Sequence, residues 1–398
     1  MTSRHLGLGL RGIGIGINFL LVFYIGEKFR DEFSSIFFQY HSLLMLISVI
    51  TKLGFDDIVT KISVRDFKQN NSSFLIYLLK NSYIYFFFNF ILAISIFFLI
   101  DIQFSFATLL FFIFLYNLNV IFFSYLNGVN KLIEGSFPLF IVSPLLIFGF
   151  IYFFDISSWI ELVNLYIISF LISLIIYLII FIRIYKESST LSFKYEIKKN
   201  IFPIATSSIA GGIGIYFSIY ILGFRLNSND LILWTYSVKI VQVLSIVVLL
   251  FNIYYAPIFR KFFINQDFKS IQSQLNKQIK YSTILLVAYI FLVPFLFNTF
   301  QLNNDSQLVT FESLFICLVI GYGISMIFSS IGSLSIMLDK QNLNGILGFT
   351  FSTTMIILFY FTETKNIFFY AITLSFCVAM PKIILFIYFR KYFKLNPK

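Results

Sequence analysis

The sequence is poor in charged residues, and this scarcity decides the class of protein before any motif is considered. Only 12% of the 398 residues are Asp, Glu, Lys or Arg, whereas soluble domains contain roughly 25%. Hydrophobic residues make up 59% of the chain, and 21% of all residues are aromatic. A water-soluble protein of this length cannot hide so much apolar surface, because its exterior must be polar. We therefore predict an integral membrane protein.

Cysteine and histidine are nearly absent, which argues against several kinds of site. Cys317 and Cys377 both fall inside apolar runs, so we expect neither a disulfide framework nor a metal centre. His5 and His41 are too far apart in the sequence to form a ligand cluster. The chain contains no Ser-His-Asp arrangement and no phosphate-loop string. We therefore predict that the protein is not an enzyme.

Apolar runs recur along the whole chain, and each is long enough to cross a bilayer, which takes about 20 residues in a helix. The predicted spans are 6–26, 36–54, 76–100, 104–126, 135–154, 158–183, 201–223, 231–256, 281–300, 310–337, 343–362 and 366–389. The predicted fold class is therefore all-α, a polytopic membrane protein with about 12 transmembrane helices.

Lysine and arginine are distributed unevenly among the connections between these spans. If the N-terminus is cytoplasmic, most of them lie on the cytoplasmic side, which is the side that the positive-inside rule favours. The segments near 184–200 and 257–280 are predicted to be the longest loops of that side. An even number of spans also places the C-terminus in the cytoplasm. The net charge of +11 is therefore interpreted as a topology signal and not as a sign of nucleic-acid binding.

The loop near 184–200 divides the chain into two halves with similar features. The first predicted helix of each half is glycine-rich, since residues 12–16 read GIGIG and residues 211–215 read GGIGI. This spacing predicts two six-helix lobes, 1–190 and 191–398, as in transporters built from repeats. Gly9, Gly12 and Gly16 share one face of the first helix, and small residues on a face let membrane helices approach closely.

A few polar and basic residues interrupt the apolar runs, although Lys or Arg at a helix centre costs about 2.5–3.5 kcal/mol on insertion scales. They form stripes on three predicted helices: Arg11 and Asn18 on the first, His41, Ser48 and Lys52 on the second, and Lys239 and Gln242 on the eighth. Arg11 and Lys52 lie near helix ends, where snorkelling to the membrane surface is an equally good interpretation. Acidic residues fall almost entirely in loops or at helix ends. The stripes predict a cationic cavity, suited to an anionic ligand such as a pyrophosphate.

Three short segments resemble segments of a known family. They are residues 24–29 (YIGEKF) after the glycine-rich stretch, residues 53–57 (LGFDD) at the end of the second helix, and residues 234–239 (WTYSVK) in the helix that runs to Pro257. Together with twelve spans in two lobes, they make the whole chain resemble the multidrug/oligosaccharidyl-lipid/polysaccharide exporter superfamily. Within it, the chain is most similar to the O-antigen flippases.

The resemblance implies a function and a set of cavity residues. It implies translocation of an undecaprenyl-pyrophosphate-linked oligosaccharide, the O-antigen repeat unit, from the cytoplasmic to the periplasmic leaflet of the bacterial inner membrane by alternating access. Helices 1, 2, 7 and 8 line a central cavity between the lobes in this superfamily. The implied substrate-binding residues are Arg11, Asn18, His41, Lys52, Ser207, Ser208, Tyr216, Lys239 and Gln242.

The resemblance also implies the driving force and the partners. A proton or sodium gradient drives transport in this superfamily and no cofactor is implied, although the sequence shows no buried carboxylate that would carry the coupling. The implied partners are membrane lipid, a polysaccharide polymerase and a chain-length regulator, without nucleic acid.

Three alternative functions stay open at this point. A multidrug/cation antiporter of the same fold would favour acidic cavity residues for cationic drugs. An O-antigen polymerase is also polytopic, but such enzymes resemble chains with a large external loop, and the external loops are predicted to be short here. A structural membrane protein would not need basic residues in the middle of its helices.

Overall fold

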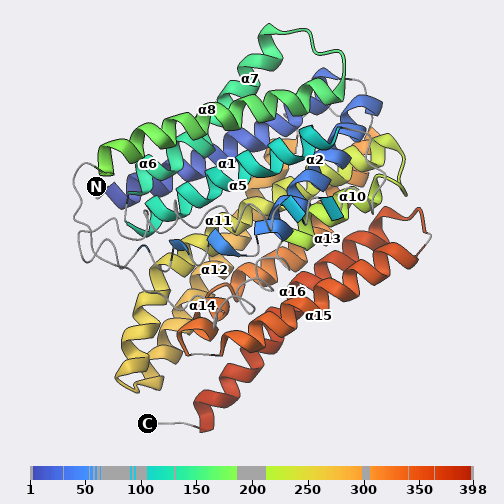
Figure 1. Cartoon of the computed structure of the whole chain (residues 1–398). Coiled ribbons are helices and arrows are strands. Elements are labelled where there is room, and N and C mark those ends of the chain that lie inside the picture. The colour runs from blue at the N-terminus through green and yellow to red at the C-terminus, as the bar shows by residue number, and fades with distance from the viewer. Residues whose placement is uncertain are drawn as a thin grey trace. The chain divides into compact units, whose positions relative to one another are not determined.

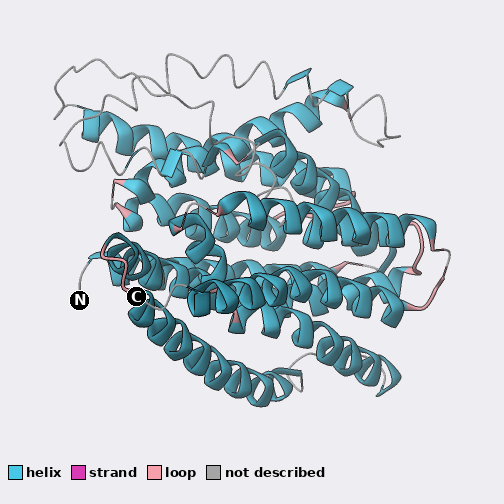
Figure 2. Cartoon of the chain, turned by 90° about the horizontal axis from the view of Figure 1, so that it is seen from below, coloured by secondary structure: helices cyan, strands magenta, loops and turns pink. Residues whose placement is uncertain are grey.

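The described part of the chain folds into helices. The computed structural model describes residues 3–29, 31–52, 54–56, 59–60, 63, 90–91, 94–95, 105–129, 131–185, 212–297, 305–338, 340–362 and 364–395. These residues contain helices, turns and no strand (Figure 2). Eight of the described helices are long and apolar enough to cross a membrane. The all-α membrane fold class is therefore confirmed.

The described helices belong to two compact units (Figure 1). The first unit, Met1–Gly212, contains α1 (Ser3–Lys28), α2 (Asp31–Lys52), α5 (Phe106–Gly128), α6 (Leu132–Ser136), η1 (Phe137–Val142), α7 (Ser143–Phe153) and α8 (Trp159–Tyr185). The second, Ile213–Lys398, contains η2 (Ile213–Phe217), α10 (Ser218–Leu222), α11 (Ser228–Ile264), α12 (Phe268–Phe297), α13 (Asp305–Ile327), α14 (Ser330–Met337), α15 (Gln341–Phe361) and α16 (Ile367–Leu395).

Parts of the prediction fall outside the described residues. The predicted boundary at 190/191, most of the predicted span 76–100 and the first part of the predicted span 201–223 lie there. The division into lobes at that boundary therefore stays a prediction.

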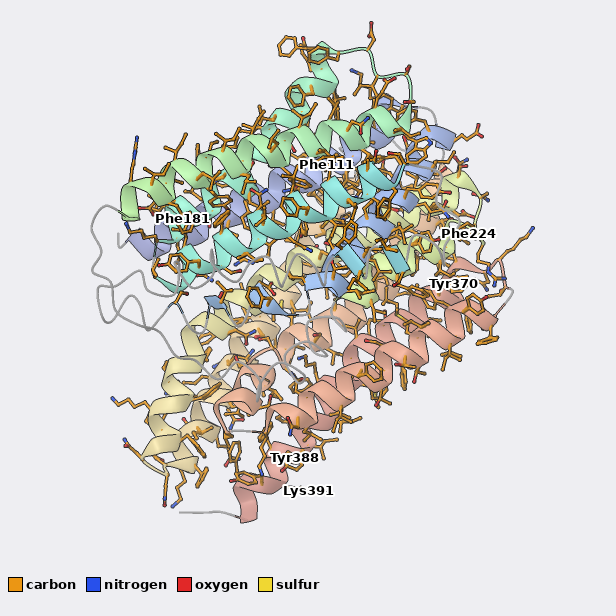
Figure 3. The ribbon with its side chains drawn as sticks, in the orientation of Figure 1. Phe111, Phe181, Phe224, Tyr370, Tyr388 and Lys391 are labelled. Atoms are coloured by element: carbon orange, nitrogen blue, oxygen red, sulfur yellow. The ribbon has the colours of Figure 1, made fainter. Side chains whose placement is uncertain are left out.

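Large apolar side chains cover much of the outer surface of the helices. Phe111 of α5 is 60% exposed and Phe224, just after α10, is 59% exposed (Figure 3). Such exposure would be costly in water, since soluble proteins rarely show large apolar patches, and it is what a lipid-facing surface requires. The exposed aromatic residues therefore agree with a helix bundle that lies in a membrane.

One transmembrane segment of the first unit contains a stretch of π-helix. The segment Leu132–Phe153 runs from α6 through η1 to α7, and Pro138 and Pro144 lie in or next to η1. Proline removes a backbone donor and disturbs the regular bonding of a helix. The neighbouring α8 bonds to this segment as well, because its Ser173 hydroxyl donates to the Pro138 carbonyl at 2.9 Å and its Tyr177 hydroxyl donates to the Gly135 carbonyl.

Helix α1 packs against this segment through two glycines. A Cβ at Gly7 would lie 2.4 Å from Cβ of Leu132, and one at Gly14 would lie 2.3 Å from the carbonyl oxygen of Phe140. A Cβ at Gly9, Gly12 or Gly16, the glycines of the predicted packing face, would meet no described atom within 4 Å, so packing through that face stays a prediction. Hydropathy cannot distinguish the two glycine faces, since only the neighbouring helix decides which face is covered.

The second unit departs from the predicted spans in two places. The segment 257–280, predicted to be a loop, is helical except for a turn at 265–267, because α11 and α12 both extend through it. Their ends pack with α14 and α16 around a core that includes Phe259, Ile271 and Leu275. The predicted single span 310–337 is interrupted at 328–329, where α13 ends and α14 begins. The side chain of Gln278 fills this break by donating to the Ile327 carbonyl at 3.0 Å and to Ser329 Oγ at 3.1 Å.

Candidate functional site

Lys52 ends α2 and forms an ion pair with Asp56. Its Nζ lies 2.7 Å from Oδ2 of Asp56, and the two side chains are only 10% and 17% exposed. The chain bends between them at Gly54, which has a φ of 67° that glycine adopts without steric cost. Within the part of the chain that the structure describes, this is the one ion pair.

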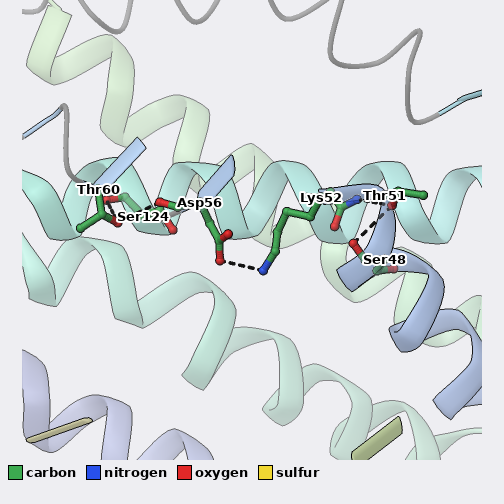
Figure 4. A network of polar contacts seen from close by, with 7 residues as sticks. Ser48, Thr51, Lys52, Asp56, Thr60 and Ser124 are labelled. Atoms are coloured by element: carbon green, nitrogen blue, oxygen red, sulfur yellow. Dashed lines mark hydrogen bonds and ion pairs between the residues drawn. The ribbon is translucent and has the colours of Figure 1, made fainter. Parts of the chain in front are cut away.

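Helix α5 holds the backbone on both sides of this pair. Asn117 Nδ2 donates to the Thr51 hydroxyl at 3.1 Å, and the Thr60 hydroxyl lies 3.2 Å from the Ser124 carbonyl oxygen. Asn117 and Ser124 are seven residues apart, which is two turns, or about 10 Å, along one face of a helix. Figure 4 shows the ion pair between Thr60 on one side and Thr51 on the other.

Arg11 of α1 lies between two aromatic rings of the first unit. Its guanidinium carbon is 5.0 Å from the ring centre of Phe123 on α5 and 5.1 Å from that of Phe140 in η1. Both distances are in the range of cation–π interactions. Its buried Nε has no hydrogen-bond partner among the described residues. The structure therefore places Arg11 in a packed contact between α1, α5 and η1.

The other candidates on α1 and α2 make local contacts. The Asn18 amide donates to the Gly14 carbonyl of its own helix at 3.0 Å. The His41 ring packs against Tyr166 of α8 and Phe112 of α5, with ring centres 4.8 Å and 5.9 Å apart. The predicted polar stripe on α2 therefore consists of residues in different surroundings, with His41 in an aromatic cluster and Lys52 in an ion pair.

Lys239 and Tyr216 come together in the second unit. The Lys239 ammonium on α11 lies 5.7 Å from the centre of the Tyr216 ring in η2, and both residues are half-buried. Lys239 is eleven residues from the start of α11, or about 16 Å along the helix axis. Gln242, also half-buried, follows three residues later on the same helix. The structure thus brings two of the predicted residues, Lys239 and Tyr216, together.

Two predicted residues, Ser207 and Ser208, lie outside the described residues. Lys382, a further basic residue within a span, lies on α16 close to α14, and a Cβ at Gly332 would be 3.2 Å from its Nζ.

Asp56 is a residue that the sequence interpretation missed. It was counted among the acidic residues of loops and helix ends, yet it is mostly buried and neutralises Lys52. The spacing of four residues from Lys52 could have indicated the pair, because residues four apart on a helix are neighbours. The spacing was only a weak indication of an ion pair, because Gly54, between Lys52 and Asp56, ends the apolar run.

The chemistry available in these sites is electrostatic. Among the residues that the structure describes, no group of three or more His, Cys, Asp or Glu side chains could hold a metal ion. Lys239 forms no ion pair with a described residue, so its charge can attract an anion. The Tyr216 ring lies beside this ammonium.

Comparison with known proteins identifies the fold. No family model and no curated protein matches the sequence. A MATE transporter solved in complex with MaL6 matches with a TM-score of 0.67 and 11% identity over 99% of this chain and 96% of its own. The inward-facing form of a multidrug resistance MATE family transporter of the MOP superfamily matches with a TM-score of 0.66 and 12% identity over 100% and 95%.

A third solved structure belongs to a MOP superfamily transporter from Pyrococcus furiosus. It matches with a TM-score of 0.63 and 12% identity, over 100% of this chain and 96% of its own. Its reversed binding-pocket polarity is said to suggest a different function. All three matches cover nearly the whole of both chains. The chain therefore has the fold of the MATE transporters of the MOP superfamily.

Proposed function

We propose that the protein is a membrane transporter that works by alternating access and carries an anionic, lipid-linked oligosaccharide. The substrate would be the undecaprenyl-pyrophosphate-linked O-antigen unit, moved to the periplasmic leaflet of a bacterial inner membrane. The fold supports transport as the general activity, since the solved proteins with this fold are transporters. The choice of substrate rests on the charges within the spans.

The observation that carries the proposal is Lys239 beside Tyr216. A cation this far inside a transmembrane helix is costly and is expected to serve a function. No described carboxylate neutralises it, so the site attracts anions and repels cations. A pyrophosphate can bind the ammonium through charge-assisted hydrogen bonds, while the polyprenyl tail stays in the lipid.

A second candidate function is multidrug antiport, which the fold comparison favours. One structure with this fold is that of a multidrug resistance MATE family transporter. An antiporter for cationic drugs would use a carboxylate to attract them. Asp56 is the mostly buried carboxylate among the described residues, but its charge is balanced by Lys52. The charges of the described residues therefore favour the anionic substrate.

Deletion of the gene, followed by analysis of lipid-linked intermediates, tests the proposal. A flippase defect should leave single repeat units on undecaprenyl pyrophosphate in the cytoplasmic leaflet and remove the surface polysaccharide. A polymerase defect should instead leave single repeats at the cell surface. Intact surface polysaccharide together with increased sensitivity to cationic drugs would support the antiporter and contradict the flippase.

A further inference from the structure

The positive charge of Lys52 is already neutralised by a neighbouring carboxylate, that of Asp56. Its ammonium lies 2.7 Å from Oδ2 of Asp56, and neither side chain is more than 17% exposed. Removing one partner from such a pair would leave the other with an uncompensated charge in a poorly hydrated place. Lys52 can therefore leave Asp56 only when another anion takes the place of the carboxylate.

The backbone around the pair is held firmly, so that an exchange of partners would involve side chains alone. Thr51 is bonded to Asn117, and the Thr60 hydroxyl lies within hydrogen-bond distance of both the Asp56 and the Ser124 carbonyl oxygens, at 3.0 and 3.2 Å. Farther along, the segment lies so close to α5 that a Cβ at Gly128 would be 1.6 Å from Ser63 Oγ. Both members of the pair are thus anchored to the same helix (Figure 4).

The carboxylate is a weak competitor for Lys52, because only half of it is satisfied. Oδ2 bonds the Lys52 ammonium, while Oδ1 is buried and has no hydrogen-bond partner among the described residues. A buried acceptor without a donor is unfavourable. The pair is therefore less stable than a fully bonded one, and an anion with more charge than a carboxylate can displace Asp56.

We propose that Asp56 is an internal competitor that makes the Lys52 site selective for multivalent phosphoanions such as a pyrophosphate. This inference rests on the proposed anionic substrate and adds a residue that determines its specificity. A pyrophosphate carries at least two negative charges and several acceptor oxygens, so it gains more from Lys52 than the single carboxylate does. A monovalent anion binds Lys52 no more strongly than the Asp56 carboxylate does, and it therefore does not displace Asp56.

The test compares two probes that share one lipid tail, farnesyl pyrophosphate and farnesyl monophosphate. Their affinities are measured by isothermal titration calorimetry at about pH 5, where the monophosphate carries roughly one negative charge and the pyrophosphate roughly two, on the purified full chain in nanodiscs of uncharged lipid. The wild-type protein should prefer the pyrophosphate. Asp56→Asn should bind both probes more tightly and the monophosphate most, so that the preference falls at least about 10-fold, or 1.4 kcal/mol. Lys52→Gln should weaken the binding of both.

Two further variants complete the comparison. Asp56→Glu keeps a competing carboxylate and should keep most of the preference. Asp31→Asn removes an exposed acid at the other end of α2 and should leave both affinities unchanged. If Asp56→Asn does not fold, as judged by its thermal unfolding transition, Asp56→Ser gives the same readout, because it also removes the charge.

The outcomes separate the two proposals. If the wild-type protein and the Asp56→Asn variant prefer the pyrophosphate equally, the proposed role of Asp56 is wrong. The proposed function is not affected by that result. Weaker binding of both probes by the Asp56→Asn variant would also contradict the proposed role of Asp56, because Asp56 would then assist binding. A wild-type protein that binds neither probe contradicts both proposals.

Discussion

The basic residues within the spans differ in what neutralises or surrounds them. Arg11 lies between the rings of Phe123 and Phe140, and Lys52 is paired with Asp56. Lys239 lies beside the ring of Tyr216. Basic residues within the spans thus lie in three different surroundings: between two rings, in an ion pair, and beside one ring without a described ion pair. Lys239 forms no ion pair with a described residue, and the proposed substrate site rests on that charge.

Replacement of Lys239 should therefore affect transport more than stability. We expect Lys239→Ala to lower export by about 10- to 100-fold, because a hydrogen bond to a charged group contributes about 1.5–3 kcal/mol. Lys239→Arg should retain most of the activity. Surface polysaccharide in a complemented deletion strain is the measurement, with the amount of inserted protein determined in parallel.

The matched control is Lys280→Ala, which removes an exposed lysine of α12 and should leave export unchanged. Full surface polysaccharide in the Lys239→Ala strain would remove Lys239 from the substrate site.

At the scale of helices, close approach at particular glycines decides the packing. Gly128 ends α5, and the segment that follows α2 lies directly against it. Gly149 of α7 is also within a span, but a Cβ there would meet no described atom within 4 Å. The two glycines therefore differ in their surroundings although both occur in apolar runs.

This difference predicts opposite effects of an added methyl group. Gly128→Ala should destabilise the protein by about 1–3 kcal/mol, the usual result of overpacking, because the new Cβ would be 2.7 Å from the Thr60 carbonyl oxygen as well as 1.6 Å from Ser63 Oγ. Gly149→Ala should be neutral or slightly stabilising, since alanine favours a helix over glycine by about 1 kcal/mol. Thermal unfolding of the purified variants in detergent measures both. Equal transitions for the two would contradict the close contact at Gly128.

Helix boundaries were the part of the fold that the sequence predicted least well. The segment 257–280 was predicted to be a loop because lysines and glutamines lower its hydropathy. Its apolar residues nevertheless recur at helical spacing, with Phe268, Ile271 and Leu275 on one face. The mean hydropathy of a window does not show such a pattern, because polar and apolar residues cancel in the average. The spacing of the apolar residues does show an amphipathic helix. The break at 328–329 has no comparable signal, because the serines there also occur within helices.

At the scale of the whole molecule, the basic residues predict the topology. The distribution of Lys and Arg predicts that both termini and the segment near Lys199 are cytoplasmic. Reporter enzymes fused after Lys199 and after Lys398 should therefore both read cytoplasmic. A fusion after Asp155, in the short connection between α7 and α8, serves as the control and should read periplasmic. A periplasmic signal from either of the first two fusions would break the twelve-span prediction.

The sequence by itself determined the class of protein and the fold class, because apolar runs of membrane length and a small share of charged residues leave only a helical bundle in lipid. It also indicated Lys239, since a charge within an apolar run is visible without a structure. Only the tertiary structure decided which charges are available. Asp56 neutralises Lys52 across a glycine bend, and rings from two other helices enclose Arg11. Such contacts depend on which helix lies beside which, and hydropathy contains no information about neighbours in space.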